Sequence, residues 1–194
     1  MITPGKIIIL NGTSSSGKTS IIRALQEILE EPLLDAGIDR FIWMLPKRYL
    51  YRPLWDEVLG LATEAGSVGQ RLISGMHQTI AALSKTGNHV AVDHVLVEPE
   101  WLQECTKLFH PLPAFLVGIH CPLEVLEQRE AARKDRTLGQ ARAQIDLVHS
   151  HGIYDLEVDT SIYSAEDCAR QIKQHLETSI PPNAFKRLYQ MGIG

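Results

Sequence analysis

Five short apolar stretches alternate along the chain with longer segments of helical periodicity. The apolar stretches have the length and β-branched content of buried strands, and they lie at residues 7–10, 32–39, 88–93, 114–120 and 154–159. Apolar residues recur at helical spacing over residues 20–30, 68–85, 99–109, 122–134 and 165–178. This alternation predicts an α/β fold, a five-stranded parallel sheet with helices on both faces. Right-handed crossovers then bring the loops after the strands to one crevice.

The loop after the first strand has the spacing G-x-x-x-x-G-K-[ST]. Its predicted nucleotide-binding residues are Gly12, Thr13, Ser14, Ser15, Ser16, Gly17, Lys18, Thr19 and Ser20. In such a loop, backbone N–H groups and the N-terminus of the next helix bind phosphate oxygens. Lys18 would neutralise the β- and γ-phosphates, and the Thr19 hydroxyl would ligate Mg2+. A strand before the loop and a helix after it favour this reading over a Ser/Gly-rich turn. They predict a P-loop NTPase of the nucleoside-kinase type with ATP and Mg2+ as cofactors.

Two aspartates follow apolar stretches that should end in the same crevice. Asp39 is predicted to end the second strand, where it could accept a proton from an alcohol that attacks the γ-phosphate. The alternative is an N-cap for a helix over residues 40–45. Asp93 ends the third apolar stretch and is a candidate Mg2+ residue, or else a cap or turn residue.

Three arginines are spaced so that they would share one helical face. Arg129, Arg133 and Arg136 would repel one another unless an anion, such as a triphosphate, met them. We interpret residues 129–142 as a helical lid over the site, with a solvated surface helix as the alternative.

The segment at residues 41–55 is unusually aromatic for a connection between elements. It could form an apolar wall for a ring-bearing substrate within substrate-side helices at about residues 40–66, or it could be ordinary core. We interpret residues 1–180 as a single kinase domain, and residues 181–194, opened by two prolines, as a loosely attached C-terminal tail.

Composition limits the classes of function. A chain of 194 residues with 44% hydrophobic content can bury one core, and a net charge of −4 without a basic block argues against nucleic-acid binding. No apolar run has the length of a membrane span, and the first strand begins too early for a signal peptide. Cys105, Cys121 and Cys168 lack metal-ligand spacing. They are interpreted as buried, reduced thiols of a cytoplasmic protein.

With these motifs in order, the chain resembles the chloramphenicol phosphotransferase family of P-loop kinases, which phosphorylate a hydroxyl of the antibiotic with ATP. The blocks that carry the resemblance are IILNGTSSSGKTSIIRALQ, EPLLDAGID, AARKDR and VHSHGIYDLEVDTS. The resemblance implies that Asp39 is the catalytic base and that Gly12 to Thr19 bind the nucleotide. It further implies that Arg133 and Arg136 belong to the lid, and that Asp159 and Thr160 lie near adenine.

The chain departs from the family pattern at two places. His94 follows Asp93 where a second acidic residue is expected, and residues 47–66 differ from the family's substrate segment. The expected activity is therefore phosphorylation of a small-molecule alcohol, chloramphenicol-like or otherwise. A sugar, shikimate-like or nucleoside kinase and a non-catalytic nucleotide-binding module are the alternatives. A switch GTPase is disfavoured because Asp93 does not begin a D-x-x-G motif.

Overall fold

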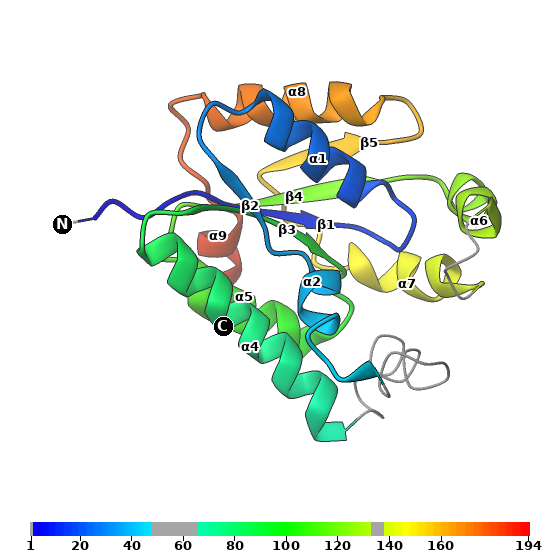
Figure 1. Ribbon diagram of the computed structural model, residues 1–194, viewed down its shortest axis with the longest axis horizontal. Helices are drawn as coiled ribbons and strands as arrows, with labels where there is room; N and C mark the ends of the chain where they lie inside the picture. Colours follow the sequence, from blue (N-terminus) through cyan, green and yellow to red (C-terminus); the bar gives the residue numbers. More distant parts are fainter. Residues whose placement is uncertain (1, 48–65, 133–137) are drawn as a thin grey trace.

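A five-stranded parallel sheet organises the molecule (Figure 1). The computed structural model describes residues 2–47, 66–132 and 138–194. The strands, in chain order, are β1 (Ile7–Asn11), β2 (Leu33–Asp35), β3 (His89–His94), β4 (Ala114–His120) and β5 (Leu156–Asp159). Their order in the sheet is β2-β3-β1-β4-β5, so β1 is central and pairs with β3 on one side and β4 on the other. The predicted parallel α/β fold is confirmed.

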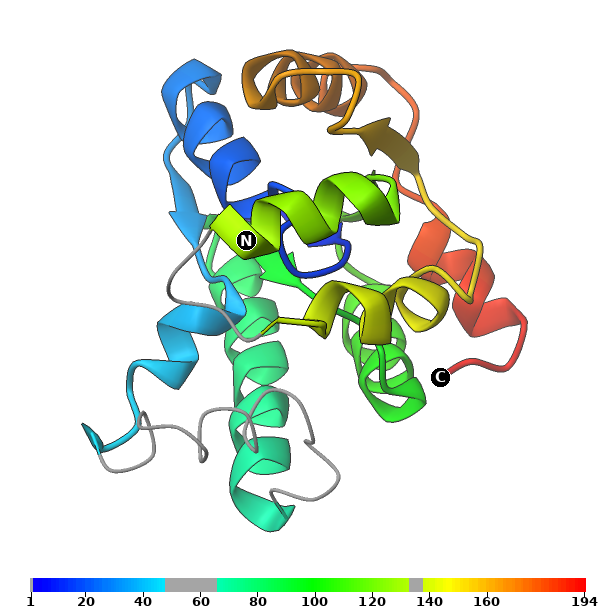
Figure 2. The same ribbon diagram turned by 90° about the vertical axis from the view of Figure 1, so that its right-hand side faces the viewer.

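Helices cover both faces of the sheet and its carboxyl edge. On one face lie α1 (Lys18–Ile28) and α8 (Ala165–Leu176). On the other lie α2 (Ile38–Ile42), α4 (Gly66–Lys85), α5 (Pro99–Phe109) and α9 (Ala184–Gln190). The helices α6 (Leu123–Ala132) and α7 (Gln140–Val148) lie beyond the carboxyl ends of the strands, and Figure 2 looks onto this edge.

The central strand explains why the sheet is covered on both sides. Side chains alternate along a strand, so Ile7 and Ile9 join the core beneath α4, α5 and α9, whereas Ile8 and Leu10 join the core beneath α1 and α8. All four are at most 1% exposed. Burying each such side chain contributes about 1.5–3 kcal/mol, which fixes the strand that carries the phosphate loop.

The second strand is shorter than the sequence predicts, and this corrects the position of Asp39. β2 ends at Asp35, whose Oδ1 accepts a hydrogen bond from the Gly37 N–H at 3.1 Å. Gly37 is the N-cap of α2, so Asp39 lies in the first turn of that helix. Asp39 is therefore neither the end of a strand nor the N-cap that we considered as an alternative.

The prediction of a loosely attached tail at residues 181–194 is wrong. The segment forms α9, and its Phe185 and Leu188 are at most 1% exposed in the core against α5 and β4. Asp155 Oδ1 accepts hydrogen bonds from the N–H groups of Asn183 (2.6 Å) and Ala184 (2.9 Å). These bonds give partners to backbone N–H groups at the start of α9 that have none within the helix. The two prolines thus precede a docked helix.

Truncating Phe185 should destabilise the protein strongly. The Phe185 ring packs edge-on against Phe109 with centroids 5.5 Å apart, and it is enclosed by the core on all sides. We expect Phe185→Ala to cost about 3–5 kcal/mol in the free energy of unfolding, because it leaves a cavity in the core. Urea unfolding measures this, with the neighbouring exposed residue changed in Lys186→Ala as the control. Equal stability of the two variants would contradict the docking of α9.

Candidate active site

The loop between β1 and α1 has the backbone of an anion-binding turn. Ser15 and Gly17 have positive φ angles of 63° and 91°, and Gly17 is the N-cap of α1. A Cβ atom at Gly12 would lie 2.6 Å from the Ile119 carbonyl oxygen, so only glycine fits against β4. The loop thus meets the helix N-terminus in the strand–loop–helix order that the motif predicts.

Lys18 folds back over this loop. Its Nζ donates hydrogen bonds to the carbonyl oxygens of Gly12 (2.8 Å) and Thr13 (2.6 Å) and lies 3.4 Å from Asp93 Oδ1. The side chain is 4% exposed. A buried ammonium group needs such partners. They also place its charge beside the loop N–H groups, where a phosphate would bind.

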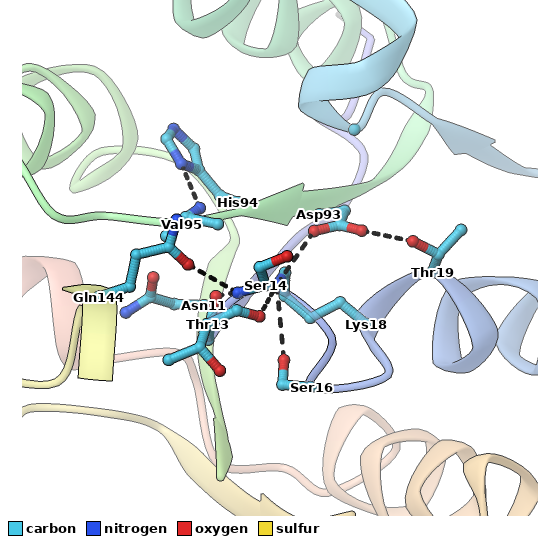
Figure 3. A network of polar contacts seen from close by, with 12 residues as sticks. Asn11, Thr13, Ser14, Ser16, Lys18, Thr19, Asp93, His94, Val95 and Gln144 are labelled. Atoms are coloured by element: carbon cyan, nitrogen blue, oxygen red, sulfur yellow. Dashed lines mark hydrogen bonds and ion pairs between the residues drawn. The ribbon is translucent and has the colours of Figure 1, made fainter. Parts of the chain in front are cut away.

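A hydrogen bond between Thr19 and Asp93 joins the start of α1 to β3. The Thr19 Oγ1 donates a hydrogen bond to Asp93 Oδ2 at 2.6 Å, and Figure 3 shows Lys18 on the other carboxylate oxygen. A hydroxyl and a carboxylate are the hard oxygen ligands that Mg2+ prefers. The two residues predicted to hold the metal therefore fit it by chemistry and lie in contact.

A cavity of about 530 Å³ opens in front of these groups and also receives Asp39. Its phosphate-loop side consists of Ser14, Ser15, Gly17, Lys18, Thr19 and Ser20. The β3 side carries Asp93 and an apolar wall of Val95, Val97 and Trp101, and α2 contributes Ile38 and Asp39. Although Asp39 is placed on a helix rather than on a strand end, it shares this cavity with Lys18 and Asp93 as predicted.

Other residues of the predicted phosphate loop do not line the cavity but contact Lys18. Gly12 and Thr13 offer their carbonyl oxygens to Lys18, and Ser16 Oγ lies 3.5 Å from its Nζ. Thr13 also lines a second, smaller pocket together with Asp159.

The segment expected near adenine is braced by Arg129. The guanidinium donates from one nitrogen to Thr160 Oγ1 (3.0 Å) and from the other to the Thr160 carbonyl oxygen (2.7 Å). Thr160 Oγ1 in turn donates to the Ser16 carbonyl oxygen at 2.9 Å. Both Arg129 and Thr160 line the main cavity, whereas Asp159 does not and instead accepts hydrogen bonds from Ser161.

Several predictions on the lid and substrate segment fall outside the described residues. These are Arg133, Arg136 and the aromatic residues of 48–55. Of the adjoining residues, Trp43 and Met44 are largely exposed, while Phe41 and Leu45 pack against the core. The three cysteines are buried and free, as the sequence predicts.

Sequence reasoning missed Asn11, the residue before the phosphate loop. Its side chain is fully buried, and its Oδ1 accepts a hydrogen bond from Leu96 N–H at 2.9 Å. The Nδ2 group donates to the Val148 carbonyl oxygen (2.7 Å) and the Tyr154 hydroxyl (2.8 Å). A polar residue at the end of an apolar strand was the available signal. Asn11 ties β1 to the loop after β3 and to the end of α7.

His94, the residue that departs from the family pattern, belongs to a buried hydrogen-bonded chain. Its Nδ1 accepts from Val95 N–H at 2.8 Å, so the neutral ring carries its proton on Nε2 and donates to His77 Nε2, also at 2.8 Å. His77 Nδ1 then donates to Glu104 Oε2 at 2.8 Å. Burial is the main cause that holds the pKa of His94 well below its usual value, and the positive charge of Lys18 lowers this pKa further.

The hydrogen bonds of His77 and His94 also bear on whether these two residues and Cys105 form a metal site. One ligand atom each of His77, His94 and Cys105 lie within 4.8 Å of one another, which suggests a metal site. The proton that His94 Nε2 donates occupies the lone pair that a metal would need. In this arrangement the histidines support the turn after Asp93, and His94 offers no free lone pair to a metal.

Stability should fall when the pH is lowered below about 6.5, the ordinary histidine pKa, because His149 stays neutral in the fold. Burial, and then the fields of His120, His151 and Lys18, lower its pKa to about 4. The unfolded chain takes up this proton between pH 6.5 and 4, whereas the folded chain does not. At pH 5 the loss is at most about 2 kcal/mol, and nearer about 1 because solvent screens the half-buried ring.

Urea unfolding at pH 7.5, 6 and 5 measures this dependence. We expect His149→Gln to flatten the decline, since glutamine does not titrate, although it loses the contact of His149 Nδ1 with the Tyr154 hydroxyl at 2.6 Å. An unchanged slope in the variant would contradict a neutral His149.

Comparison with known proteins now bears on the site. A family model described as chloramphenicol phosphotransferase-like protein matches residues 5–177, which include the phosphate loop, Asp39, Asp93 and Thr160. The chain belongs to this family. Proteins of two strains of Mycobacterium tuberculosis, named as candidate O-phosphotransferases, are 34% identical to it over 95% of this chain and 88% of their own length.

Solved structures place the fold among the P-loop kinases. The APS kinase of Mycobacterium tuberculosis, in complex with AMPPNP and APS, has a TM-score of 0.63 and 19% identity over 90% of this chain and 99% of that chain. A gluconokinase from Sinorhizobium meliloti has a TM-score of 0.63 and 16% identity over 98% and 99%. Family and fold together support a phosphotransferase of the kinase type. Among the described residues, no helix combines the length and apolarity needed to cross a bilayer.

Proposed function

We propose that this protein is an ATP-dependent O-phosphotransferase that acts on a hydroxyl group of a small molecule. The observation that carries the proposal is one cavity that receives Lys18, the Thr19–Asp93 pair and Asp39. Phosphoryl transfer needs a cation for the phosphates, oxygen ligands for a metal and a base for the acceptor, and these residues supply all three. A cytoplasmic location, where ATP is available, accords with this activity.

The phosphate loop would bind the nucleotide. Its N–H groups, the N-terminus of α1 and Lys18 offer a concentrated positive potential to the β- and γ-phosphates. Thr19 and Asp93 would hold Mg2+, which neutralises phosphate charge when bound. Arg129 and Thr160 support the adenine side, and we assign Arg133 and Arg136 to the lid by the family resemblance.

The acceptor hydroxyl would be activated by Asp39. The oxygen of the acceptor hydroxyl attacks the γ-phosphorus in line. The bond from the γ-phosphorus to the β–γ bridging oxygen breaks, and ADP leaves with that electron pair. The hydroxyl proton passes to the Asp39 carboxylate, which is half-buried and lines the cavity.

The acceptor side of the cavity favours a substrate with an apolar or aromatic body. Ile38, Val95, Val97 and Trp101 form its wall. An apolar wall contributes to binding through buried area, which suits a chloramphenicol-like alcohol better than a sugar or a shikimate-like acid. We propose the former class as the acceptor.

A panel of alcohols in an ATP-consumption assay with Mg2+ tests the proposal. It should include chloramphenicol, other aryl alcohols, sugars, shikimate and nucleosides. We expect acceptor-dependent consumption with an aromatic or apolar alcohol. Turnover with a sugar alone would overturn the proposed acceptor class, and acceptor-independent hydrolysis throughout would overturn O-phosphotransfer.

A further inference from the structure

A glutamine on α7 contacts the phosphate loop from the side opposite α1. Gln144 Oε1 accepts a hydrogen bond from the Ser14 N–H at 2.7 Å, and Figure 3 shows this contact beside the Lys18–Asp93 network. Gln144 also lines the cavity that receives Lys18, Asp93 and Asp39. The two bonded residues are 130 positions apart in the sequence.

The Ser14 N–H determines how the carboxamide is turned. An N–H group can only donate, so the oxygen of Gln144 must face it, and the NH2 group, with two donors, must face away from Ser14. The helix is held in place at its end as well, since the Val148 carbonyl oxygen accepts from Asn11 Nδ2 at 2.7 Å. The NH2 group is therefore presented by a fixed helix at the edge of the cavity.

Gln144 and Lys18 bind the two edges of one peptide unit. The Thr13 carbonyl oxygen accepts from Lys18 Nζ at 2.6 Å, and the N–H of the same peptide, that of Ser14, donates to Gln144. The planar peptide fixes the relative position of the ammonium group and the carboxamide. Both present N–H donors to the cavity, on either side of the stretch of loop that begins at Ser14.

We propose that Gln144 is a further catalytic residue, whose Nε2 donates a hydrogen bond to the terminal phosphoryl group of the nucleotide during transfer. This inference rests on the proposed function and adds a residue to it. Any γ-phosphoryl oxygen that Lys18 and a bound Mg2+ did not contact would keep its negative charge unneutralised. A preorganised neutral donor there stabilises transfer at no cost of reorganisation.

A purely structural role makes a different prediction. If Gln144 only clamps α7 to the loop, its oxygen alone matters, and glutamate would serve as well because a carboxylate oxygen also accepts from Ser14 N–H. Gln144→Glu therefore keeps the clamp, removes the donor and adds a repelling charge. Gln144→Met keeps the approximate shape and removes both donor and acceptor.

Calorimetric binding of ADP and of the ATP analogue AMPPNP, with Mg2+, separates these roles because only AMPPNP carries a γ-phosphoryl group. For Gln144→Met we expect ADP affinity within about threefold of wild type and AMPPNP affinity at least about tenfold weaker, the equivalent of one lost hydrogen bond to a charged group. For Gln144→Glu, whose charge also repels the β-phosphate, we expect AMPPNP affinity to fall at least about tenfold more than ADP affinity. With an accepted alcohol, kcat should fall by about a hundredfold or more in Gln144→Glu.

The matched control is Arg142→Gln on the same helix. Its guanidinium bonds to Glu127 of α6 and does not line the cavity, so both affinities should stay at wild-type values. Equal weakening of ADP and AMPPNP, or wild-type behaviour of Gln144→Glu, would overturn the proposal in favour of the clamp. Tighter AMPPNP binding by Gln144→Met would also overturn it, because the carboxamide would then compete with phosphate for Ser14 N–H.

The binding comparison stands apart from the test of the proposed function. If the wild-type protein phosphorylates no alcohol, the proposed function fails, while the ratio of AMPPNP to ADP affinity still reports whether Gln144 meets the γ-phosphoryl group.

Discussion

Replacing Lys18 by alanine is expected to lower the rate of phosphoryl transfer by more than about a hundredfold, a loss of roughly 3 kcal/mol of transition-state stabilisation. The Lys18 side chain is 4% exposed, and its ammonium group lies between two loop carbonyl oxygens and Asp93, so its charge is poorly screened by water. In such a place it would stabilise the growing phosphate charge far more than a surface lysine could. Steady-state kinetics with ATP and an accepted alcohol measure the effect.

The control for this variant is Lys6→Ala. Lys6 Nζ also donates to a backbone carbonyl oxygen, that of Leu176 at 2.9 Å, but it precedes β1 and lies away from the cavity. The Lys6→Ala variant loses the same charge as Lys18→Ala and should keep near-normal turnover. Both proteins should show similar circular dichroism. If Lys18→Ala kept turnover within tenfold of wild type, Lys18 would have no role in transfer.

Asp39→Asn is expected to lower phosphorylation by about a hundred- to ten-thousandfold, because asparagine cannot accept the hydroxyl proton. The change keeps the shape of a side chain in the first turn of α2, so ATP affinity and melting temperature should stay near wild type. A structural Asp39 predicts the opposite: normal turnover of the folded fraction and a loss of up to about 1 kcal/mol of stability. Thermal melts with and without ATP, beside a transfer assay, distinguish the two.

Asp35→Asn is the matched control on the same turn. Asp35 bonds to the Gly37 N–H and to Arg40, and it does not line the cavity. Its loss should reduce stability slightly and leave the transfer rate of the folded protein unchanged. Comparable rate losses in the two variants would mean that the turn, and not the Asp39 carboxylate, is required.

Local patterns in the sequence were sufficient for the sheet and the phosphate loop. The run Ile7 to Leu10 is short and rich in isoleucine, which favours a buried strand, and the loop after it is defined by spacing within eight residues. The strand at 32–39 was wrong in its extent because Gly37 and the Asp35 side chain start a helix, a competition that apolar content does not reveal. Asp39 still reached the cavity because the turn leaves it on the same edge of the sheet.

Contacts between distant segments could not be predicted. The bond of Gln144 to Ser14 and the chain from Glu104 through His77 to His94 each depend on how separate helices pack. The tail was misjudged for the same reason. Its buried apolar residues, Ala184, Phe185 and Leu188, are too few for a clear helical pattern, yet they pack into the core beside the sheet.

The most direct test of the central claim is 31P nuclear magnetic resonance of a reaction that contains ATP, Mg2+ and an alcohol from the panel labelled with 18O at its hydroxyl. The proposed mechanism predicts a new phosphomonoester resonance that grows in step with ADP. It also predicts an isotope shift on that resonance, because the labelled oxygen becomes the ester oxygen. Inorganic phosphate as the sole product, for every alcohol tried, would contradict phosphoryl transfer to a hydroxyl.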